Sequence, residues 1–402
     1  MKNRAYTVAM VLLVAVCFSS IAGAMTAPDR FQAQGRHQSP KTHKAVPDKV
    51  LPMQYMGVSE NNILTQSLKL AGLAKAMGVN LVRVNIKFQL SDPLESDSSV
   101  DPSTYMPSPD DLQQLCNAAK ALVNINIKNL MLTFMPTLNT GYPQSPTALD
   151  ELNNIIDSYL AELYGPTGCA NASGVHMLSL MLQPGNEMNI DTFCQPQNDS
   201  DHRFCAQVAA VMQASVYDFV KKSEVPKYGL PITVVGASVA SHHTPYLYLS
   251  EYQHKMNVLT HCSAGCMDVF DFHPYALWGS CDQMSGFKMY PNLMSAVSQV
   301  FGKPIPILYG EWAVQTKESN TEGYLNTEPW NCLVVPEDQL ASVWTSAIGY
   351  AGQQQVLGLV NEHICDEQRL DNGFQSGLMN WTCDRRKLGF AAISQMIQSA
   401  HQ

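Results

Sequence analysis

The chain has 402 residues, of which 46% are hydrophobic and 15% are charged, and its formal net charge is −9. This composition excludes an intrinsically disordered chain, and the length excludes a small disulfide-stapled domain. The acidic balance argues against a nucleic-acid partner and against binding to an anionic membrane surface. The length is compatible with one large α/β domain or with two or three smaller ones.

The first 24 residues have the pattern of a secretory signal peptide. Lys2 and Arg4 precede an apolar run at 8–16, and small residues at 22–24 provide a cleavage site. The apolar run is too short to span a bilayer comfortably. We therefore predict a secreted protein with no membrane association after cleavage of residues 1–24. Residues 25–50 are polar and predict a flexible leader, and residues 51–402 predict a single folded domain.

Cleavage would remove one of the 11 cysteines, Cys17, and leave an even set of ten. In an oxidising compartment such a set is typical of disulfides, and no Cys-x-x-Cys pair supports a zinc or thioredoxin-like site. The favoured short-range pairs are Cys194 with Cys205 and Cys365 with Cys383, and Cys262 with Cys266 is a weaker candidate. Tripeptides that accept N-linked glycans in eukaryotes begin at Asn171, Asn198 and Asn380.

Eight short apolar runs of β type alternate with segments of helical periodicity. Eight strands that alternate with helices predict a (β/α)8 TIM barrel, an α/β fold, as a single domain with long βα loops. The alternative is an open doubly wound sheet, which usually carries a phosphate-binding glycine turn, and the sequence has no G-x-G-x-x-G and no Walker loop. The predicted strands are residues 53–58, 81–86, 129–134, 177–182, 232–236, 269–273, 305–309 and 356–360, and the predicted helices include 66–77, 110–123, 148–163, 204–222 and 338–352.

Polar residues follow three of the predicted strands, at the end of a barrel where enzymes of this fold carry their sites. Asn186 and Glu187 follow the fourth strand, His273 ends the sixth, and Glu311 follows the seventh. The two glutamates come from opposite sides of the ring and can meet across its axis. Glycoside hydrolysis requires such a pair, one acid to protonate the leaving oxygen and one carboxylate to attack or to activate water.

These residues resemble the retaining glycoside hydrolases of clan A, of the family 5 and family 39 type. Those enzymes carry Asn-Glu after strand four and a second Glu after strand seven, which Asn186-Glu187 and Glu311 match in order. The resemblance implies that Glu187 is the acid/base and Glu311 the nucleophile. It also implies that Asn186 contacts the sugar 2-hydroxyl. No cofactor and no metal are implied, because two carboxylates suffice for the reaction.

The resemblance extends to residues that bind or position the reacting groups. Arg83 looks like the clan's arginine near the nucleophile, and Tyr275, with His273, looks like its partners from strand six. Sugar rings stack on aromatic faces. We therefore predict that Trp312, next to the second glutamate, and Trp278, in the loop after strand six, form sugar subsites.

Other polar residues have weaker interpretations. His242 and His243, taken with His261 and His273, do not have the tight spacing of a metal site, and adjacent residues of a strand face opposite sides. Ser238 does not lie in the G-x-S-x-G motif of serine hydrolases. Glu362 and His363 follow strand eight, where the clan commonly has a tryptophan, and they are either substrate contacts or solvated loop residues.

The sequence therefore predicts a secreted, monomeric glycosidase with a carbohydrate substrate and a double-displacement mechanism. Within this class, an exo-acting β-xylosidase or arabinofuranosidase is an alternative to an endo-acting enzyme. In another class, the chain could be a non-catalytic carbohydrate-binding protein built on a glycosidase scaffold.

Overall fold

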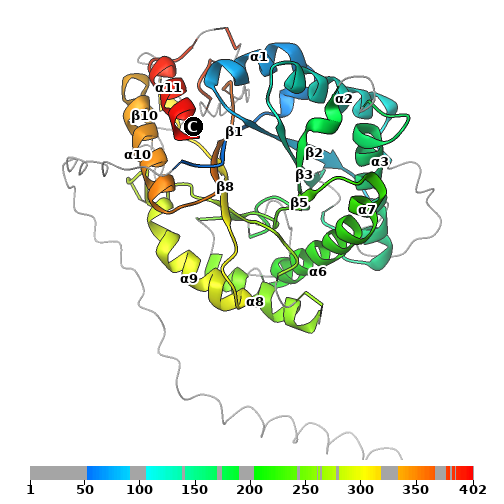
Figure 1. The fold of residues 1–402 in the computed structure, drawn as a ribbon. Helices are drawn as coiled ribbons and strands as arrows, with labels where there is room; N and C mark the ends of the chain where they lie inside the picture. Colours follow the sequence, from blue (N-terminus) through cyan, green and yellow to red (C-terminus); the bar gives the residue numbers. More distant parts are fainter. Residues whose placement is uncertain are drawn as a thin grey trace, which may run out of the picture. The chain divides into compact units, whose positions relative to one another are not determined.

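Nine strands form one parallel sheet in the computed structural model of the chain, in the order β5-β4-β3-β2-β1-β11-β8-β7-β6 (Figure 1). Consecutive β5 and β6 share one place in the ring, because Val235 between them pairs with Val269 just before β7. The sheet thus closes into eight strand positions, which confirms the predicted (β/α)8 barrel. The strands are β1 (Tyr55–Ser59), β2 (Leu81–Phe88), β3 (Asn129–Pro136), β4 (Ser179–Gln183), β5 (Ile232–Val234), β6 (Val239–Ala240), β7 (Phe270–His273), β8 (Ile307–Trp312) and β11 (Gly358–Asn361), and β9 (Thr316–Lys317) pairs separately with β10 (Val335–Pro336).

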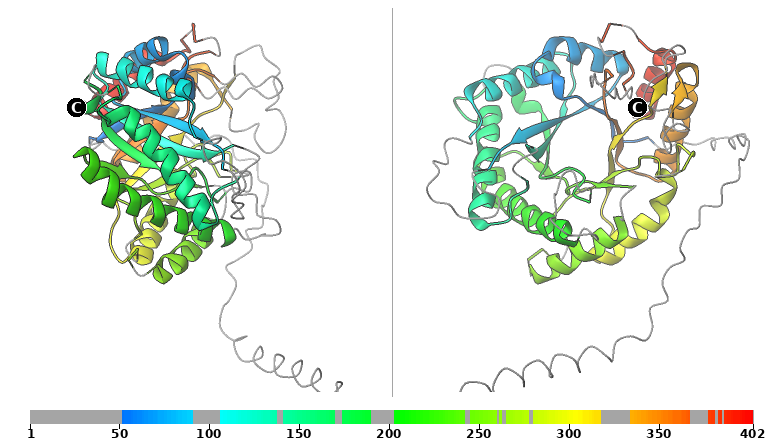
Figure 2. Two further views of the ribbon diagram at one scale, coloured as in Figure 1. Left: turned by 90° about the vertical axis from the view of Figure 1, so that its right-hand side faces the viewer. Right: turned by 180° about the vertical axis from the view of Figure 1, so that it is seen from behind.

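The helices lie on the outside of the ring of strands (Figures 1 and 2). Helix α2 begins at a capping box, in which the Ser108 hydroxyl accepts the Asp111 N–H at 3.2 Å and the Asp111 carboxylate accepts the Ser108 N–H at 3.0 Å. None of the described helices is both long enough and apolar enough to cross a membrane. The α-helices are α1 (Ser67–Met77), α2 (Pro109–Asn124), α3 (Pro146–Tyr164), α6 (Arg203–Phe219), α7 (Val225–Tyr228), α8 (Pro245–Val258), α9 (Tyr290–Phe301), α10 (Leu340–Gln353) and α11 (Phe390–Ala400), and shorter helical turns are η1 (Asn61–Leu64), η3 (Val175–Met177), η4 (Val220–Glu224), η5 (Phe287–Met289) and η8 (Glu337–Gln339).

The structure describes most of the unit formed by residues 46–402. The predicted signal peptide and the predicted leader lie outside the described residues, as do Asn171 and Asn198. The described residues are 52–90, 106–137, 141–169, 174–189, 203–241, 245–259, 261–262, 265–277, 280–317, 334–366, 377–380, 383–384 and 386–401.

The fourth strand begins later than the sequence predicts. Residues 175–177 form the helical turn η3 instead of extending β4, which begins at Ser179. Gly174 precedes this turn in the left-handed conformation (φ 71°), which a residue with a Cβ rarely adopts. The apolar run at 175–182 therefore divides between a helical turn that packs on the core and a strand of the ring.

The interior of the ring is layered from apolar to polar along the strand direction. A small apolar cluster fills the inner face near the amino ends of the strands. Two residues further along four of these strands, on the same face, the side chains are polar. A closed ring with no exposed edge can bury this polar layer only if its members hydrogen-bond one another. The cluster comprises Tyr55, Leu81, Met131, Met181, Val235, Val269, Leu308 and Val360, and the polar layer comprises Arg83, Thr133, Gln183 and Asp271.

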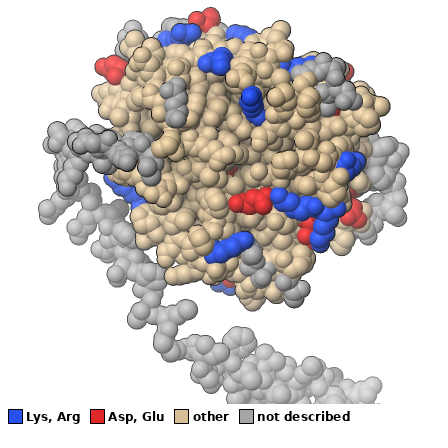
Figure 3. Space-filling model, viewed as in Figure 1, with Lys and Arg blue, Asp and Glu red and all other residues tan. Residues whose placement is uncertain are grey.

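Some charged groups on the surface form local pairs. On the face drawn in Figure 3 the basic side chains are scattered, and acidic and basic groups mix at its lower right. Lys222 pairs with Asp218 at 2.8 Å within one helix, and His261 lies 3.0 Å from the same carboxylate. Exposed pairs of this kind contribute little to stability.

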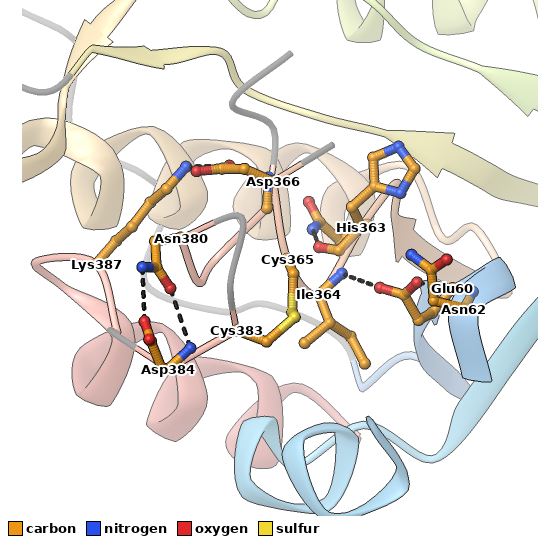
Figure 4. The surroundings of a disulfide bond; sticks show 12 residues. Glu60, Asn62, His363, Ile364, Cys365, Asp366, Asn380, Cys383, Asp384 and Lys387 are labelled. Carbon is orange, nitrogen blue, oxygen red and sulfur yellow. Dashed lines mark hydrogen bonds and ion pairs between the residues drawn. A yellow bond between two sulfur atoms is a disulfide. The ribbon is translucent and has the colours of Figure 1, made fainter. Parts of the chain in front are cut away.

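Two disulfides fasten loops of the barrel. The Cys365–Cys383 bond confirms the predicted pair and joins the loop after β11 to the segment before α11 (Figure 4). Cys262–Cys266, the weaker candidate, also forms. Cys205 is disulfide-bonded as well, but Cys194 lies outside the described residues, so that pairing stays a prediction.

An ion pair and hydrogen bonds surround the Cys365–Cys383 bond (Figure 4). The buried Lys387 ammonium pairs with the Asp366 carboxylate at 2.5 Å. The side-chain amide of Asn380, one of the three glycan acceptors predicted above, donates to Asp384 at 2.7 Å. These contacts and the disulfide together hold the loop after strand β11 beside the end of the barrel that carries the predicted site.

Candidate active site

Glu311, at the end of β8, lies against a guanidinium and a phenol. Arg83 from β2 forms an ion pair with its Oε2, and the Tyr275 hydroxyl donates to its Oε1 at 2.5 Å. Burial alone would raise the pKa of this carboxyl, which is 8% exposed, but the charges of Arg83 and His273 and the two hydrogen bonds lower its pKa to about 2. Glu311 is therefore ionised at any ordinary working pH.

Arg83 is fully buried and is aligned by three further oxygens. Its Nε donates to the Thr133 hydroxyl at 3.0 Å, and its Nη2 donates to the Asn186 Oδ1 at 2.5 Å and to the Gln183 Oε1 at 3.4 Å. A buried arginine requires such partners, because its five N–H donors are otherwise left without water. The Asn186 oxygen also accepts from Ser238 at 3.1 Å, so two donors hold the amide oxygen of Asn186 in place.

Glu187, after β4, lies against an imidazole. His273 Nδ1 is 2.8 Å from its Oε1, and His273 Nε2 is 3.3 Å from Asp271 Oδ2. Burial would lower the pKa of His273, but the charges of Asp271 and Glu311 raise its pKa to about 10, so both ring nitrogens donate. Burial raises the pKa of Glu187 and outweighs the opposing effect of His273. Glu187 is therefore the carboxyl of the pair that retains a proton more easily.

The turn that carries Glu187 has an unusual backbone conformation. Its φ of 46° lies in the left-handed region, which is uncommon for a residue with a side chain. The Glu187 N–H donates to the Ser238 hydroxyl at 2.6 Å, and the Asn186 N–H donates to the Tyr142 hydroxyl at 2.9 Å. These two bonds hold a strained turn in place, as is common at functional sites.

Asp271, in the polar layer, contacts the surroundings of both Glu187 and Glu311. Its Oδ2 accepts from Gln183 Nε2 at 2.5 Å, and its Oδ1 accepts from the Gly310 N–H at 2.8 Å. A Cβ at Gly310 would lie 2.1 Å from Asp271 Oδ1, so only glycine fits there. Asp271, which raises the pKa of His273, therefore also restricts the position before Glu311 to glycine.

The two glutamates lie close enough to act on one bond. One oxygen of Glu187, one of Glu311 and a ring nitrogen of His273 all lie within 4.8 Å of one another. This spacing would also suit a metal ion. However, His273 holds its protons, and Arg83 occupies one oxygen of Glu311, so this donor set does not favour a cation.

A histidine–glutamate pair lies at the end of β11, beside this site. His363 Nε2 is 3.5 Å from Glu362 Oε1, and Figure 4 shows His363 next to Glu60. Burial would lower the pKa of His363, but Glu362 and Glu60 raise its pKa to about 9. The charge of Glu362 also contributes to raising the pKa of Glu187, which shows that the two groups interact.

The structure brings together six of the eight residues predicted for the site, and the two tryptophans are not among them. The Trp312 indole is only 1% exposed and packs against Phe287 and Trp344, with ring centroids 5.5 and 5.3 Å away. The prediction that Trp312 stacks on a sugar is therefore corrected, because its ring belongs to the core between the strands and the helices. Trp278, His242 and His243 lie outside the described residues.

The sequence interpretation missed the groups that hold the site residues. Thr133 and Gln183 align Arg83, and Ser238 and Tyr142 fix the turn of Glu187. Thr133 and Gln183 had a detectable signal, since each lies two residues after an inward-facing methionine of its strand. Ser238 and Tyr142 come from loops, and nothing in their sequence context points to the site.

The fold resembles several solved structures. No protein-family model matches the sequence, and no curated protein matches it either. A glucosidase from Croceicoccus marinus superposes with a TM-score of 0.60 at 14% identity, over 88% of this chain and 69% of that chain.

Two other solved structures have lower scores. A family 39 glycoside hydrolase from Bacteroides cellulosilyticus WH2 has a TM-score of 0.53 at 13% identity, over 86% of this chain and 64% of that one. An endo-1,4-β-mannanase from Rhizomucor miehei has a TM-score of 0.52 at 12% identity, over 88% and 97%. At such identities the similarity establishes the shared barrel fold, and the site geometry must carry the argument for function.

Proposed function

We propose that this protein is a secreted glycoside hydrolase that cleaves a polysaccharide or oligosaccharide with retention of configuration. Glu311 is the nucleophile and Glu187 the acid/base. The spacing of the two carboxylates carries this proposal, since a pair of their oxygens lies within 4.8 Å. Retaining glycosidases hold their carboxyl groups about 5–5.5 Å apart, whereas inverting enzymes need about 6.5–9.5 Å to admit a water.

The electrostatics of the pair support the same roles. The pKa of Glu311 is about 2, so this carboxylate is charged and can attack an anomeric carbon. The pKa of Glu187 is raised by burial, so this carboxyl can hold the proton that the leaving oxygen needs. Two carboxyl groups with pKa values displaced in opposite directions are the pattern of an acid and a nucleophile.

The reaction then runs in two displacements. Glu311 bonds to the anomeric carbon while Glu187 protonates the departing oxygen, which gives a covalent glycosyl ester. Glu187, now a carboxylate, takes a proton from water, and the water displaces Glu311 with a second inversion. Arg83 and Tyr275 stabilise the negative charge of Glu311 before it attacks and again when it leaves in the second step.

The solved structures with this fold agree with the proposal. Their names describe a glucosidase, a family 39 glycoside hydrolase and an endo-1,4-β-mannanase, all of which act on glycosidic bonds. The disulfides of the described loops are also typical of a secreted chain. The β linkage in the mannanase name favours a β-linked or similarly equatorial glycoside as the substrate.

A substrate panel tests the proposal. The wild-type protein is assayed against aryl β-glycosides and β-linked polysaccharides, with the Glu187→Ala and Glu311→Ala variants as controls. We expect turnover by the wild type alone, and proton NMR should show that the first product anomer has the configuration of the substrate. An inverted product would refute the double displacement, and sugar binding without turnover in all three proteins would favour a non-catalytic carbohydrate-binding protein.

A further inference from the structure

Two thiols lie against each other in the helical layer of the barrel. Cys116 is on α2 and Cys169 follows the end of α3, and both thiols are buried. Their sulfur atoms lie within 4.8 Å of each other, and the residues are 1% and 5% exposed. Neither residue takes part in the site described above.

Backbone hydrogen bonds to the last turn of α3 fix the position of Cys169. The Gly165 N–H donates to Ala161 O and the Cys169 N–H donates to Glu162 O, both at 2.7 Å, so the chain folds back on the last turn of α3. A Cβ at Gly168 would lie 2.1 Å from Glu162 O, which requires glycine in this turn. Cys169 is thus held against Cys116, which faces inward from α2.

We propose that Cys116 and Cys169 form a disulfide bond in the mature protein. The two S–H bonds break, one S–S bond forms, and the two protons pass, through water, to the sulfur atoms of the oxidant. Two electrons pass to a disulfide oxidant, either an oxidoreductase disulfide or glutathione disulfide, which is reduced to two thiols. Only a short approach of the two sulfur atoms is required, because they already lie within 4.8 Å of each other.

A metal ion is the competing occupant, since a Glu162 oxygen also lies within 4.8 Å of both sulfur atoms. The charge nearby argues against a cation. Interaction with Cys116 raises the pKa of Lys120, so a positive group lies near the sulfur that a metal would need. Burial raises the pKa of the Cys169 thiol, which opposes the thiolate form that metals bind. A disulfide needs no charge at either sulfur once it is formed.

The bond would enclose the part of the barrel that contains β3 and α3. A cross-link over a long segment restricts the unfolded chain more than one over a short segment. The Cys262–Cys266 bond spans only a four-residue separation and the Cys365–Cys383 bond spans 18. Of these three, the Cys116–Cys169 bond should therefore contribute most to stability.

Peptide mapping tests the bond directly. The full chain is expressed into an oxidising compartment and equilibrated with glutathione disulfide until the Cys262–Cys266 and Cys365–Cys383 cross-links are complete in the digest. It is then denatured, blocked with N-ethylmaleimide and digested without reductant. We expect a peptide pair joined through Cys116 and Cys169. The proposal is overturned if both cysteines carry the maleimide adduct, or if they become reactive only after a chelator removes a bound metal.

Serine variants test its contribution to stability. Cys116→Ser and Cys169→Ser should each lower Tm by roughly 3–8 °C, and the double variant should lower it no further. Removing either end of a disulfide has the same effect as removing both, whereas two packing defects would add. A double variant whose loss equals the two single losses combined would contradict a bond between these residues. Glycosidase activity, if present, should persist in all three variants at 25 °C, which separates this test from that of the proposed function.

Discussion

Glu311 lies against the permanent charge of Arg83 and the hydroxyl of Tyr275, whereas Glu187 lies against an imidazole whose own charge depends on Asp271. Both carboxyl groups are buried to a similar degree, with 8% and 7% exposure. Burial therefore raises the pKa of both, and only the neighbours separate them. The pKa of Glu311 falls to about 2 because two strong donors face it, while that of Glu187 stays raised.

One polar layer thus displaces the pKa values of two carboxyl groups in opposite directions. Arg83 and Asp271 lie at equivalent depths in the barrel, each two residues after an apolar residue of the inner cluster. The arginine acts on Glu311 directly, and the aspartate acts on Glu187 through His273. Substitutions on either side should therefore have different consequences for rate and for pH dependence.

The largest effect is expected from Glu311→Gln, which removes the proposed nucleophile. kcat/KM should fall about 10⁴-fold or more, since no other carboxylate can reach the anomeric carbon in the same way. Steady-state kinetics on aryl glycosides measures the loss. Glu151→Gln, which alters a buried glutamate on α3, is the matched control and should retain the wild-type rate. A Glu311→Gln enzyme with more than a tenth of the wild-type activity would assign the nucleophile elsewhere.

Glu187→Ala should have a smaller effect that depends on the leaving group. The loss should be about 10²–10⁴-fold for sugar leaving groups and less for activated aryl groups, which leave without a proton. Added azide should restore turnover and form a β-glycosyl azide, because a small anion can replace the missing base. Rescue in Glu311→Ala instead, with the opposite anomer, would exchange the two assignments.

Tyr275→Phe tests the hydrogen bond that Tyr275 donates to Glu311. Loss of the hydrogen bond at 2.5 Å should raise the pKa of Glu311 by about 1–2 units. The nucleophile must be ionised, so activity is lost as pH falls through this pKa, and the acid limb of kcat/KM should move to higher pH. The maximal rate should fall by roughly 10–100-fold. An acid limb that does not move would show that the Tyr275 hydroxyl does not stabilise the Glu311 carboxylate.

Much of the barrel and the convergence of the two glutamates could be predicted from the sequence, because both depend on regular spacing. Apolar runs at strand length alternate with helical segments, and polar residues follow the strands at the end where barrels carry their sites. The six polar residues assigned to the site converge for this reason. The later start of β4 could not be predicted, since an apolar run does not reveal which part turns into a helix.

The Trp312 prediction failed because Glu311 and Trp312 are adjacent in one strand and face opposite sides, and an irregularity of the strand decides which of them faces inward. Leu359 pairs with Tyr309, and Asn361 pairs with Trp312, so β8 advances three residues where β11 advances two. The extra residue in β8 breaks the alternation of faces. Glu311 consequently faces the barrel interior, and the Trp312 ring turns outward into the core. Bulges of this kind are common beside active sites and depend on pairing across strands, which one sequence does not display.

Glu362→Gln should produce the smallest change, and it tests the effect of the Glu362 charge on the pKa of Glu187. Burial is the main cause of the raised pKa of Glu187, and the negative charge of Glu362 adds to it, so its removal should lower that pKa. Glu187 must be protonated in the first step, so activity is lost as pH rises through its pKa. The basic limb of kcat/KM should therefore move to lower pH by roughly half a unit, with the rate at the optimum within about threefold of the wild type. The acid limb should move less, because Arg83 and Tyr275 dominate around Glu311. A shift of the basic limb to higher pH would mean that Glu362 stabilises the ionised form of Glu187, through His363 for example, and would reverse the sign assigned to this pair.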